Sequence, residues 1–170
     1  VAQQVLIGKT NKEIVKLLNT KGGRAIGISG LDGSFIECEK QKVIVDGEEV
    51  DIGYVGKIKH VKRCILDLLC NDQWIPVIAP IGTDDEGSSY NINADTVASA
   101  VAAAVEAEKL MLLTDVEGIK DGDGNIVYEA GREQIEEMIE DGTINGGMIP
   151  KVKGCLDAIE NGVTGVHIID

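Results

Sequence analysis

The amino-acid sequence predicts an α/β fold built as a three-layer sandwich, in which a mainly parallel central sheet is covered by helices on both faces. Short, fully apolar segments such as Ile75–Ala79 and Leu110–Leu113 alternate with segments of helical periodicity, which is typical of parallel strands buried on both faces. Between residues 35 and 54, polar and apolar residues alternate instead. This pattern adds an antiparallel hairpin section with one exposed side.

The first predicted elements are a helix and a buried strand. Thr10 followed by Glu13 has the pattern of a capping box, so we expect a helix to begin there and to end at Gly22–Gly23. The preceding Val5–Ile7 fits either a strand or a turn of helix. The apolar segment Ala25–Ser29 predicts the first buried strand.

The antiparallel section comes next. Phe35–Glu39 and Lys42–Val45 have the alternation of hairpin strands, and Asp46–Gly47 predicts a turn into a further strand at Glu49–Tyr54. Helical spacing returns over Val61–Leu69.

The second half of the chain predicts alternating strands and helices. In order, these are a strand at Ile75–Ala79, a polar loop to Asn93, an alanine-rich helix at 94–107, a strand at Leu110–Leu113, a loop at 115–125, helices at 133–140 and 150–161, and a strand at Val166–Ile169. Ligands of open α/β sheets bind beyond the carboxyl ends of the strands. We therefore expect a site at the loops after Ala79 and Leu113 and before Pro150.

Composition excludes several classes of function. The 170 residues hold 16 Lys and Arg against 29 Asp and Glu, and the formal net charge of −13 excludes a nucleic-acid binder that neutralises phosphates with a basic face. No apolar run reaches the roughly 18 to 20 residues of a membrane span. We therefore expect a soluble protein with no nucleic-acid partner and no membrane partner.

The residues that bind metals in other proteins do not form a recognisable site in this sequence. No C-x-x-C pair and no histidine pair occurs among Cys38, Cys64, Cys70, Cys155, His60 and His167. Asp121–Asn125 resembles a calcium loop, but its twelfth position is Arg132 instead of glutamate, so we expect no EF-hand and no protein-bound metal. We expect the cysteine thiols to be reduced, as is typical of a cytoplasmic protein. The Walker and Rossmann glycine motifs are also missing from the sequence.

The segment Asn91-Ile92-Asn93-Ala94-Asp95 precedes the alanine-rich helix and allows two interpretations. In the first, Asn93 is an N-cap and Asp95 is a first-turn acid that stabilises the helix dipole. In the second, Asn91, Asn93 and Asp95 present two amides and a carboxylate to one cavity. There Asp95 would hold lysine ammonium groups charged and oriented.

A lysine follows a glycine pair in Gly146-Gly147-Met148-Ile149-Pro150-Lys151 and falls in the first turn of a predicted helix. A cation there opposes the helix dipole by a few tenths to about 1 kcal/mol, unless an anion lies between the lysine and the end amides. Lys151 is therefore a candidate phosphate ligand, and an exposed surface lysine is the alternative.

Taken together, these segments resemble the amino-acid kinase family. The resemblance is carried by N-I-N-A-D at 91–95, L-L-T-D-V-E-G-I at 112–119 and G-G-M-I-P-K-V at 146–152, in the family's order and spacing, and by G-K-T-N-K-E at 8–13, G-G-R-A at 22–25 and I-S-G-L-D-G at 28–33. It covers essentially the whole chain and is specific, because several separate motifs agree. It implies the amino-acid kinase fold.

The resemblance also implies an activity and a set of site residues. The activity is ATP-dependent phosphorylation of the side-chain carboxylate of N-acetyl-L-glutamate to an acyl phosphate in arginine biosynthesis, with ATP and Mg²⁺ as cofactors. Catalysis is assigned to Lys151 and Asp95, and substrate binding to Asn91 and Asn93. Nucleotide binding is assigned to Asp115, Val116, Glu117, Gly118, Ile119, Lys120, Ile144, Asn145, Met148 and Lys151.

The resemblance further divides a single structural domain into two functional halves. Residues 1–74 form the C-terminal part of the acceptor-binding half, with its hairpins, and residues 75–170 form the nucleotide-binding half. The family's N-terminal lysine, glycine-rich loop and substrate-binding arginine, and its closing C-terminal strands, are expected to lie outside the 170 residues. We therefore expect a homo-oligomeric enzyme of which this segment, truncated at both ends, is inactive by itself.

Two other functions stay open. One is that of another family member, glutamate 5-kinase or uridylate kinase, although N-I-N-A-D and the hairpin section favour acetylglutamate as the acceptor. The other is a non-catalytic fragment that binds a nucleotide or another ligand without turnover. Phosphorylation assays with each acceptor separate these functions.

Overall fold

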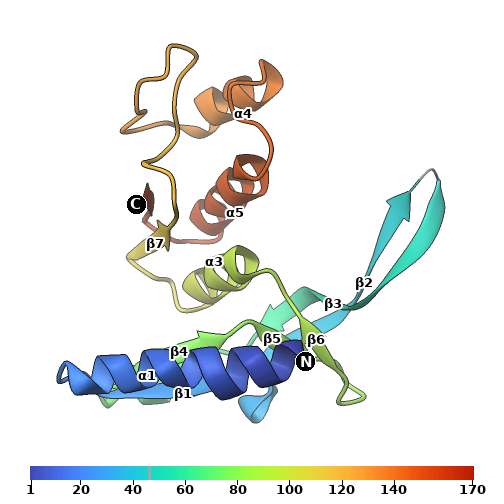
Figure 1. Ribbon diagram of the computed structural model, residues 1–170, viewed down its shortest axis with the longest axis vertical. Helices are drawn as coiled ribbons and strands as arrows, with labels where there is room; N and C mark the ends of the chain where they lie inside the picture. The colour runs from blue at the N-terminus through green and yellow to red at the C-terminus, as the bar shows by residue number, and fades with distance from the viewer. Residues whose placement is uncertain (46) are drawn as a thin grey trace. The chain divides into compact units, whose positions relative to one another are not determined.

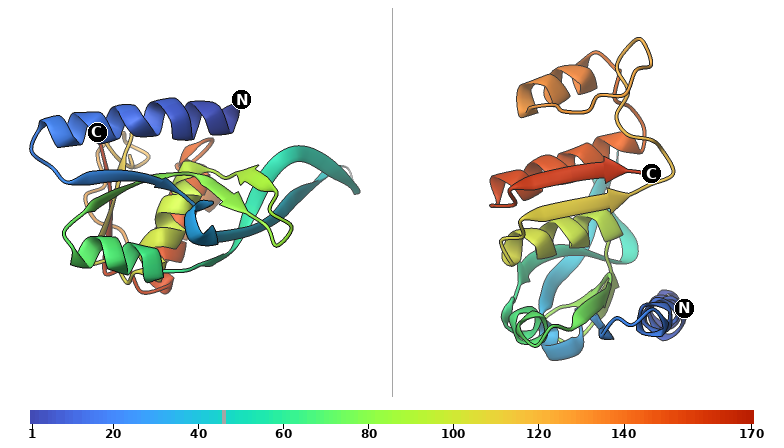
Figure 2. Two further views of the ribbon diagram at one scale, coloured as in Figure 1. Left: turned by 90° about the horizontal axis from the view of Figure 1, so that it is seen from below. Right: turned by 90° about the vertical axis from the view of Figure 1, so that its left-hand side faces the viewer.

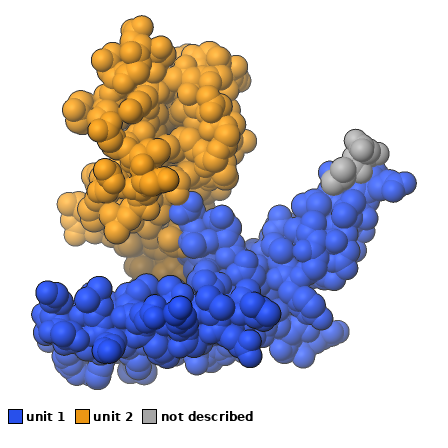
Figure 3. Space-filling view, in the orientation of Figure 1, with its two compact units in different colours: residues 1–97 blue, residues 98–170 orange. Residues whose placement is uncertain are grey.

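A pair of parallel strands lies in each of two compact units, residues 1–97 and 98–170 (Figures 1 and 3). The computed structural model describes residues 1–45 and 47–170. β1 (Ala25–Ser29) pairs with β4 (Ile75–Ala79) in the first unit, and β7 (Lys109–Leu113) pairs with β8 (Gly165–Ile169) in the second. The α/β class and the parallel pairing are confirmed. They differ from the prediction in forming one pair in each unit instead of a single central sheet.

Helices cover both faces of the β1–β4 pair. α1 (Asn11–Thr20) packs on one face and α2 (Cys64–Asn71) on the other, as both views in Figure 2 show. α1 ends where the sequence predicts, because Gly22 has a φ of +88° and the Gly23 N–H donates to the carbonyl of Leu18 at 3.0 Å. This unit therefore has the three layers of the predicted sandwich.

The capping box predicted at Thr10 is wrong. η1 (Gln4–Thr10), a π-helix, runs directly into α1, so Val5–Ile7 is helical. Thr10 has helical dihedral angles (φ −59°, ψ −48°), and its side chain makes no cap hydrogen bond. Because the helix has already begun, the backbone N–H groups that follow Thr10 can bond within it.

The antiparallel section is one long hairpin, in which β2 (Ile36–Val45) pairs with β3 (Glu48–Val61). Figure 1 shows the hairpin projecting away from β1 and β4. The separate strands predicted at Phe35–Glu39 and Lys42–Val45 are therefore one strand with a register shift after Lys40. Such a shift breaks the alternation of the sequence, which explains the prediction of two strands.

Three other predictions concern residues next to the hairpin. The turn predicted at Asp46–Gly47 includes Asp46, which lies outside the described residues. β3 continues to Val61, which still pairs with Ile36, so the helix predicted to begin at Val61 begins at Cys64. The segment predicted as a polar loop before Asn93 holds two short strands.

These strands complete a small closed barrel. β5 (Ile81–Thr83) and β6 (Ser89–Asn91) pair antiparallel with each other, and each joins one strand of the long hairpin in the order β2-β3-β6-β5. Each has only three residues, too few for an alternating pattern to appear in the sequence. The barrel is what orients the loop between β5 and β6.

The second unit packs helices on one face of β7–β8. These are α5 (Met148–Glu160) and residues 98–104 of α3 (Ala94–Ala104), as Figure 2 shows. Small side chains of the two helices pack against Leu110 and Leu112. α4 (Arg132–Glu140) packs on α5. The predicted helices are confirmed, with α3 ending earlier than predicted and α5 beginning two residues before Pro150.

The compact units divide at 97/98, because β4, which begins at Ile75, pairs along its whole length with β1 and so belongs to the first unit. The assignment of residues 1–74 and 75–170 to two functional halves stays a prediction. Among the described residues, no helix is long and apolar enough to cross a membrane.

Candidate active site

A cavity of about 460 Å³ lies in the second unit, where β7 ends and α5 begins. This is the carboxyl end of the parallel strand pair, the edge at which α/β proteins bind ligands. The cavity is lined by Asp115, Val116, Glu117, Gly118, Ile119, Lys120, Thr143, Ile144, Asn145 and Met148.

The lining brings together two segments that were selected from the sequence for nucleotide binding. Every residue selected for that role lies in the lining except Lys151, which follows Met148 in the first turn of α5. Thr143 also lines the cavity and was missed. Its position directly before Ile144 is the signal that could have identified it.

The first wall is the loop after β7, which the backbone holds in place. The Thr114 N–H donates to the carbonyl of Ile169 at 2.9 Å, which extends the strand pairing by one residue. The Val127 N–H donates to the carbonyl of Ile119 at 2.8 Å. Between these bonds Gly118 is buried with a φ of +144°, a conformation that side chains rarely adopt. Glycine therefore allows the turn that forms this wall.

The second wall is the loop between α4 and α5. Ile144 is only 2% exposed, and its N–H donates to the carbonyl of Met138 at 2.7 Å. The Asp141 carboxylate accepts the Thr143 N–H at 2.8 Å, and hydrogen bonding from Thr143 lowers the pKa of Asp141. The Asn145 side-chain amide donates to a backbone carbonyl within the same loop. These bonds hold the loop against the core of the unit.

The N-terminus of α5 suits an anion. Gly147 at the N-cap supplies no side-chain hydrogen bond, and the first turn of α5 holds no acidic residue of its own, so the turn itself adds no negative charge to the positive end of the helix. Lys151 is half-buried in that turn. Lys120 is a cation in the lining of the cavity, and it forms an exposed ion pair with Glu117 at 3.2 Å. An apolar wall beside this cationic end can hold a planar base with an anionic tail.

A second cavity, of about 630 Å³, shares Glu117, Gly118 and Ile119 with the first. It is lined mainly by apolar side chains of α5, β8 and the segment 126–130. Its composition provides few groups for a phosphate, so the first cavity is the better candidate for an anionic ligand.

The structure places Asn91, Asn93 and Asp95 on three different local structures. Asn91 is exposed on β6, Asn93 caps α3, and Asp95 is half-buried in the first turn of α3. The Asn93 Oδ1 accepts the Thr96 N–H at 3.1 Å, so the N-cap interpretation is confirmed for Asn93. Their roles in substrate binding and catalysis stay predictions.

The segment that resembles a calcium loop is a closed turn. The Asp121 Oδ1 accepts the N–H groups of Asp123 and Asn125 at 3.0 and 2.8 Å, and hydrogen bonding to Asn125 lowers the pKa of Asp121. The Asp121 carboxylate therefore accepts hydrogen bonds from the backbone of its own turn. In the part of the chain that the structure describes, no group of three or more His, Cys, Asp or Glu side chains could hold a metal ion.

Comparison with known proteins identifies relatives over the full length of the chain. It is 53% identical over 172 residues to a protein named acetylglutamate kinase from Caldicellulosiruptor saccharolyticus, and 48% identical over 176 residues to one of the same name from Saccharophagus degradans. Each match covers 100% of this chain and 59% of the relative. The chain therefore spans about 59% of the length of these curated relatives.

A solved structure also matches. The crystal structure of smu.665 from Streptococcus mutans UA159 superimposes with a TM-score of 0.86 at 28% identity, and the match covers 99% of this chain and 66% of that chain. The model of the family described as "Amino acid kinase family" matches residues 1–170. Since that match extends from the first residue to the last, this chain belongs to the amino acid kinase family.

Proposed function

We propose that this chain is part of an enzyme that uses ATP to phosphorylate the side-chain carboxylate of N-acetyl-L-glutamate, a step of arginine biosynthesis. The observation that carries the proposal is the cavity at the end of β7, whose lining contains all the residues selected for nucleotide binding except Lys151. The names of the relatives that match the whole chain support N-acetyl-L-glutamate as the acceptor.

The cavity fits the chemical parts of a nucleotide. The apolar side chains of Val116, Ile119 and Met148 suit the base, and the amide of Asn145 suits hydrogen bonding to it. The N-terminal turn of α5 suits the phosphates, since it has no acid and contains Lys151. Bound Mg²⁺ would neutralise phosphate charge. Most of its ligands would be phosphate oxygens and water molecules instead of protein side chains.

The proposed chemistry needs no covalent intermediate with the protein. Phosphoryl transfer depends on positioning and on stabilising charge on the transferred group. In this proposal the Lys151 ammonium donates hydrogen bonds to the transferred phosphoryl group, and Asp95 orients lysine ammonium groups. Asn91 donates its amide to the acceptor. Because the reacting carboxylate is already ionised at neutral pH, no general base has to remove a proton from it.

A panel of acceptors tests the proposal. The enzyme that contains this chain is incubated with ATP and with N-acetyl-L-glutamate, L-glutamate or uridine monophosphate, and ADP formation is measured. We expect ADP formation with N-acetyl-L-glutamate to exceed that with the other acceptors by about a hundredfold or more, because unpaired polar groups in a site reject the wrong acceptor. Preference for L-glutamate or uridine monophosphate would identify the other family members instead. Nucleotide binding without transfer to any acceptor would identify a non-catalytic fragment.

We also propose that the enzyme is a cytoplasmic homo-oligomer. α1 supports self-association, because Ile14 and Leu17 are 43% and 60% exposed on its surface. Light scattering coupled to size-exclusion chromatography tests this part of the proposal. A monomer at micromolar concentration would contradict it.

A further inference from the structure

The loop between β5 and β6 is organised by one carboxylate. The Asp84 Oδ1 accepts the N–H groups of Glu86 and Ser88 at 3.0 and 2.8 Å, and the Asp84 N–H donates to the carbonyl of Ser88 at 3.1 Å. Gly87 has a φ of +82°, which closes the turn. Asp84 is half-buried. Because its carboxylate and its backbone N–H bond residues 86 and 88, Asp84 connects both ends of this loop.

The closed turn at 121–125 has the same pattern of hydrogen bonds. Its Asp121 accepts the N–H groups two and four residues later, and its own N–H donates to the carbonyl of Asn125 at 2.9 Å. Gly124 has a φ of +85°, close to that of the corresponding glycine in the first loop. The chain thus contains two copies of one local structure, which can be compared directly.

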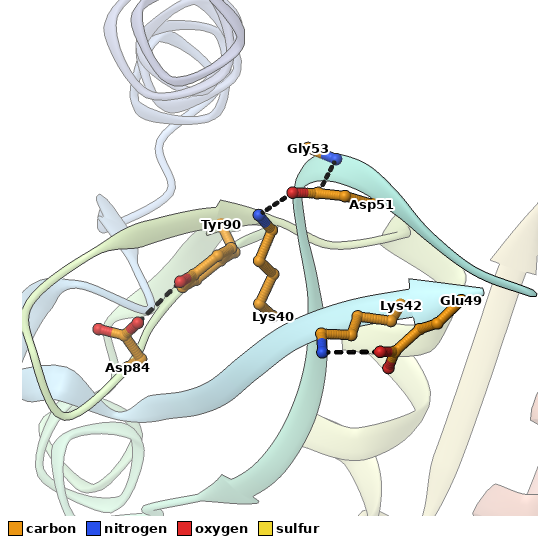
Figure 4. A network of polar contacts seen from close by, with 7 residues as sticks. All are labelled: Lys40, Lys42, Glu49, Asp51, Gly53, Asp84 and Tyr90. Carbon is orange, nitrogen blue, oxygen red and sulfur yellow. Dashed lines mark hydrogen bonds and ion pairs between the residues drawn. The ribbon is translucent and has the colours of Figure 1, made fainter.

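The two loops differ in what the second carboxylate oxygen binds. The Asp121 Oδ2 accepts the side-chain amide of Asn125, within its own loop, at 3.2 Å. The Asp84 Oδ2 instead accepts the hydroxyl of Tyr90 at 2.8 Å, a bond that reaches out of the loop into β6 (Figure 4). This bond lowers the pKa of Asp84 and raises the pKa of Tyr90. Only the first loop is therefore coupled to a strand by its aspartate.

Tyr90 anchors β6 in the barrel. It is 7% exposed, and its ring centroid lies 6.1 Å from that of Tyr54 on β3. Its neighbour Asn91 is exposed, and the backbone of Asn91 is in register with Ile81 on β5 and Val55 on β3. Since successive side chains of a strand point to opposite faces, a bond that fixes the buried Tyr90 side chain also sets the direction of the exposed Asn91 on the opposite face of β6.

We infer that Asp84 is a positioning residue for the acceptor: through Tyr90 it holds β6 so that Asn91 is presented in one orientation. The inference rests on the proposed function, because it assigns Asn91 to the acceptor. Asp84 touches no substrate in this account. Its effect on the acceptor passes through the Tyr90 hydroxyl and the backbone of β6.

Kinetics of the Tyr90→Phe variant test the inference. The variant keeps the ring and removes the hydroxyl, so we expect the KM for N-acetyl-L-glutamate to rise about threefold to tenfold, as for the loss of one hydrogen bond. The KM for ATP and kcat should stay within about twofold. Adding Asp84→Asn to Tyr90→Phe should raise the acceptor KM little beyond its value in Tyr90→Phe alone, because without the hydroxyl residue 84 has no bond to β6 left to lose.

Asp121→Asn is the matched control. This variant weakens a loop with the same backbone hydrogen bonds, whose aspartate does not bond to a strand. Its acceptor KM therefore shows the effect of weakening the loop alone. We expect Asp121→Asn to leave the KM for N-acetyl-L-glutamate unchanged. An equal rise of the acceptor KM in Asp121→Asn, or an unchanged acceptor KM in Tyr90→Phe, would overturn the inference.

Hydrogen exchange separates a failure of this inference from a failure of the proposed function. In the ligand-free protein, Tyr90→Phe should speed the exchange of backbone amides at residues 88–92 and leave those at 122–126 unchanged. If no acceptor is phosphorylated, the proposed function fails, and the exchange data still decide whether Tyr90 holds β6. Unchanged exchange at residues 88–92 would overturn the inference whatever the activity.

Discussion

Asp84, Asp121 and Asp141 each accept backbone N–H groups of the loop that they begin. Hydrogen bonds lower the pKa values of the three carboxyl groups: those from the Tyr90 hydroxyl and then the loop backbone for Asp84, from Asn125 for Asp121, and from the side chain and backbone of Thr143 for Asp141. The carboxylates therefore stay charged at neutral pH in a chain that already has a formal net charge of −13. Their use is structural, because each closes a turn that would otherwise leave backbone donors without a partner.

The raised pKa of Tyr90 predicts that the free energy of unfolding falls at high pH. The bond of the Tyr90 hydroxyl to Asp84 raises this pKa above the ordinary value of 10.0, so just above pH 10 the unfolded chain loses this proton while the folded chain keeps it. The bond's contribution is complete below pH 10 and is lost as the pH rises through the folded-state pKa. We expect urea unfolding between pH 9 and about 11 to show a steeper loss of stability in the wild type than in Tyr90→Phe. If the free energy of unfolding fell equally steeply with pH in the two proteins, the raised pKa could not be assigned to Tyr90.

Asp95 distinguishes a catalytic role from a structural one. Asp95→Asn keeps the shape of the side chain and removes its charge, so the proposed function predicts that turnover falls at least tenfold with little change in melting temperature. If Asp95 only stabilises the helix dipole, the variant loses about 1 kcal/mol or less of stability and keeps normal turnover. Measuring melting temperature and turnover on the same sample decides between the two.

At the scale of elements, the loop after β7 depends on the backbone of Gly118. Gly118→Ala places a side chain at a φ of +144°, although the new Cβ would have ordinary contacts, the nearest at 3.6 Å from Ile126. We expect a loss of about 1 to 3 kcal/mol of stability from backbone strain and weaker nucleotide binding. Chemical denaturation and calorimetric titration with ATP measure the two effects.

Gly122→Ala is the control for that prediction. Gly122 lies in the same long loop, and a Cβ added there meets no atom within 4 Å. We expect nearly unchanged stability and ATP affinity in this variant. Comparable losses in both variants would show that the loop tolerates no added side chain, and the specific role of Gly118 would be wrong.

Elements that are apolar along their whole length could be predicted from the sequence. Ala25–Ser29 and Ile75–Ala79 are strands at the predicted residues, because each is a short apolar run between turn-forming residues. β5 and β6 could not be predicted, since three residues hold no period and their pairing depends on the distant hairpin. The cap at Thr10 was predicted wrongly because Thr10 is a capping residue type that lies where the π-helix η1 runs into α1.

The candidate site was predicted where separate segments resemble the family. That resemblance identified the two walls of the cavity, and the structure brings them together within the second unit. Thr143 was missed because it belongs to none of the quoted motifs. The bond between Asp84 and Tyr90 was missed for a physical reason: the two residues meet only through the register of β5 and β6.

At the scale of the whole molecule, the net charge of −13 opposes the approach of an anionic nucleotide. Salt screens this repulsion, because the Debye length falls from about 30 Å at 0.01 M to about 8 Å at 0.15 M. We expect the association rate of a fluorescent ATP analogue to rise over this range in stopped-flow measurements, and that of an uncharged adenosine analogue to stay constant. A falling rate for the ATP analogue would show that positive charge near the site dominates at long range.

Trapping of the acyl phosphate with hydroxylamine tests the central claim most directly. The enzyme that contains this chain should form the hydroxamate from ATP and N-acetyl-L-glutamate. Lys151→Ala should form it about a hundredfold more slowly, the effect of losing about 3 kcal/mol of transition-state stabilisation, while its affinity for ATP changes less than about threefold. Lys153→Ala, at an exposed lysine of the same helix, should match the wild type. No hydroxamate from the wild type, or turnover in Lys151→Ala within twofold of it, would contradict the account.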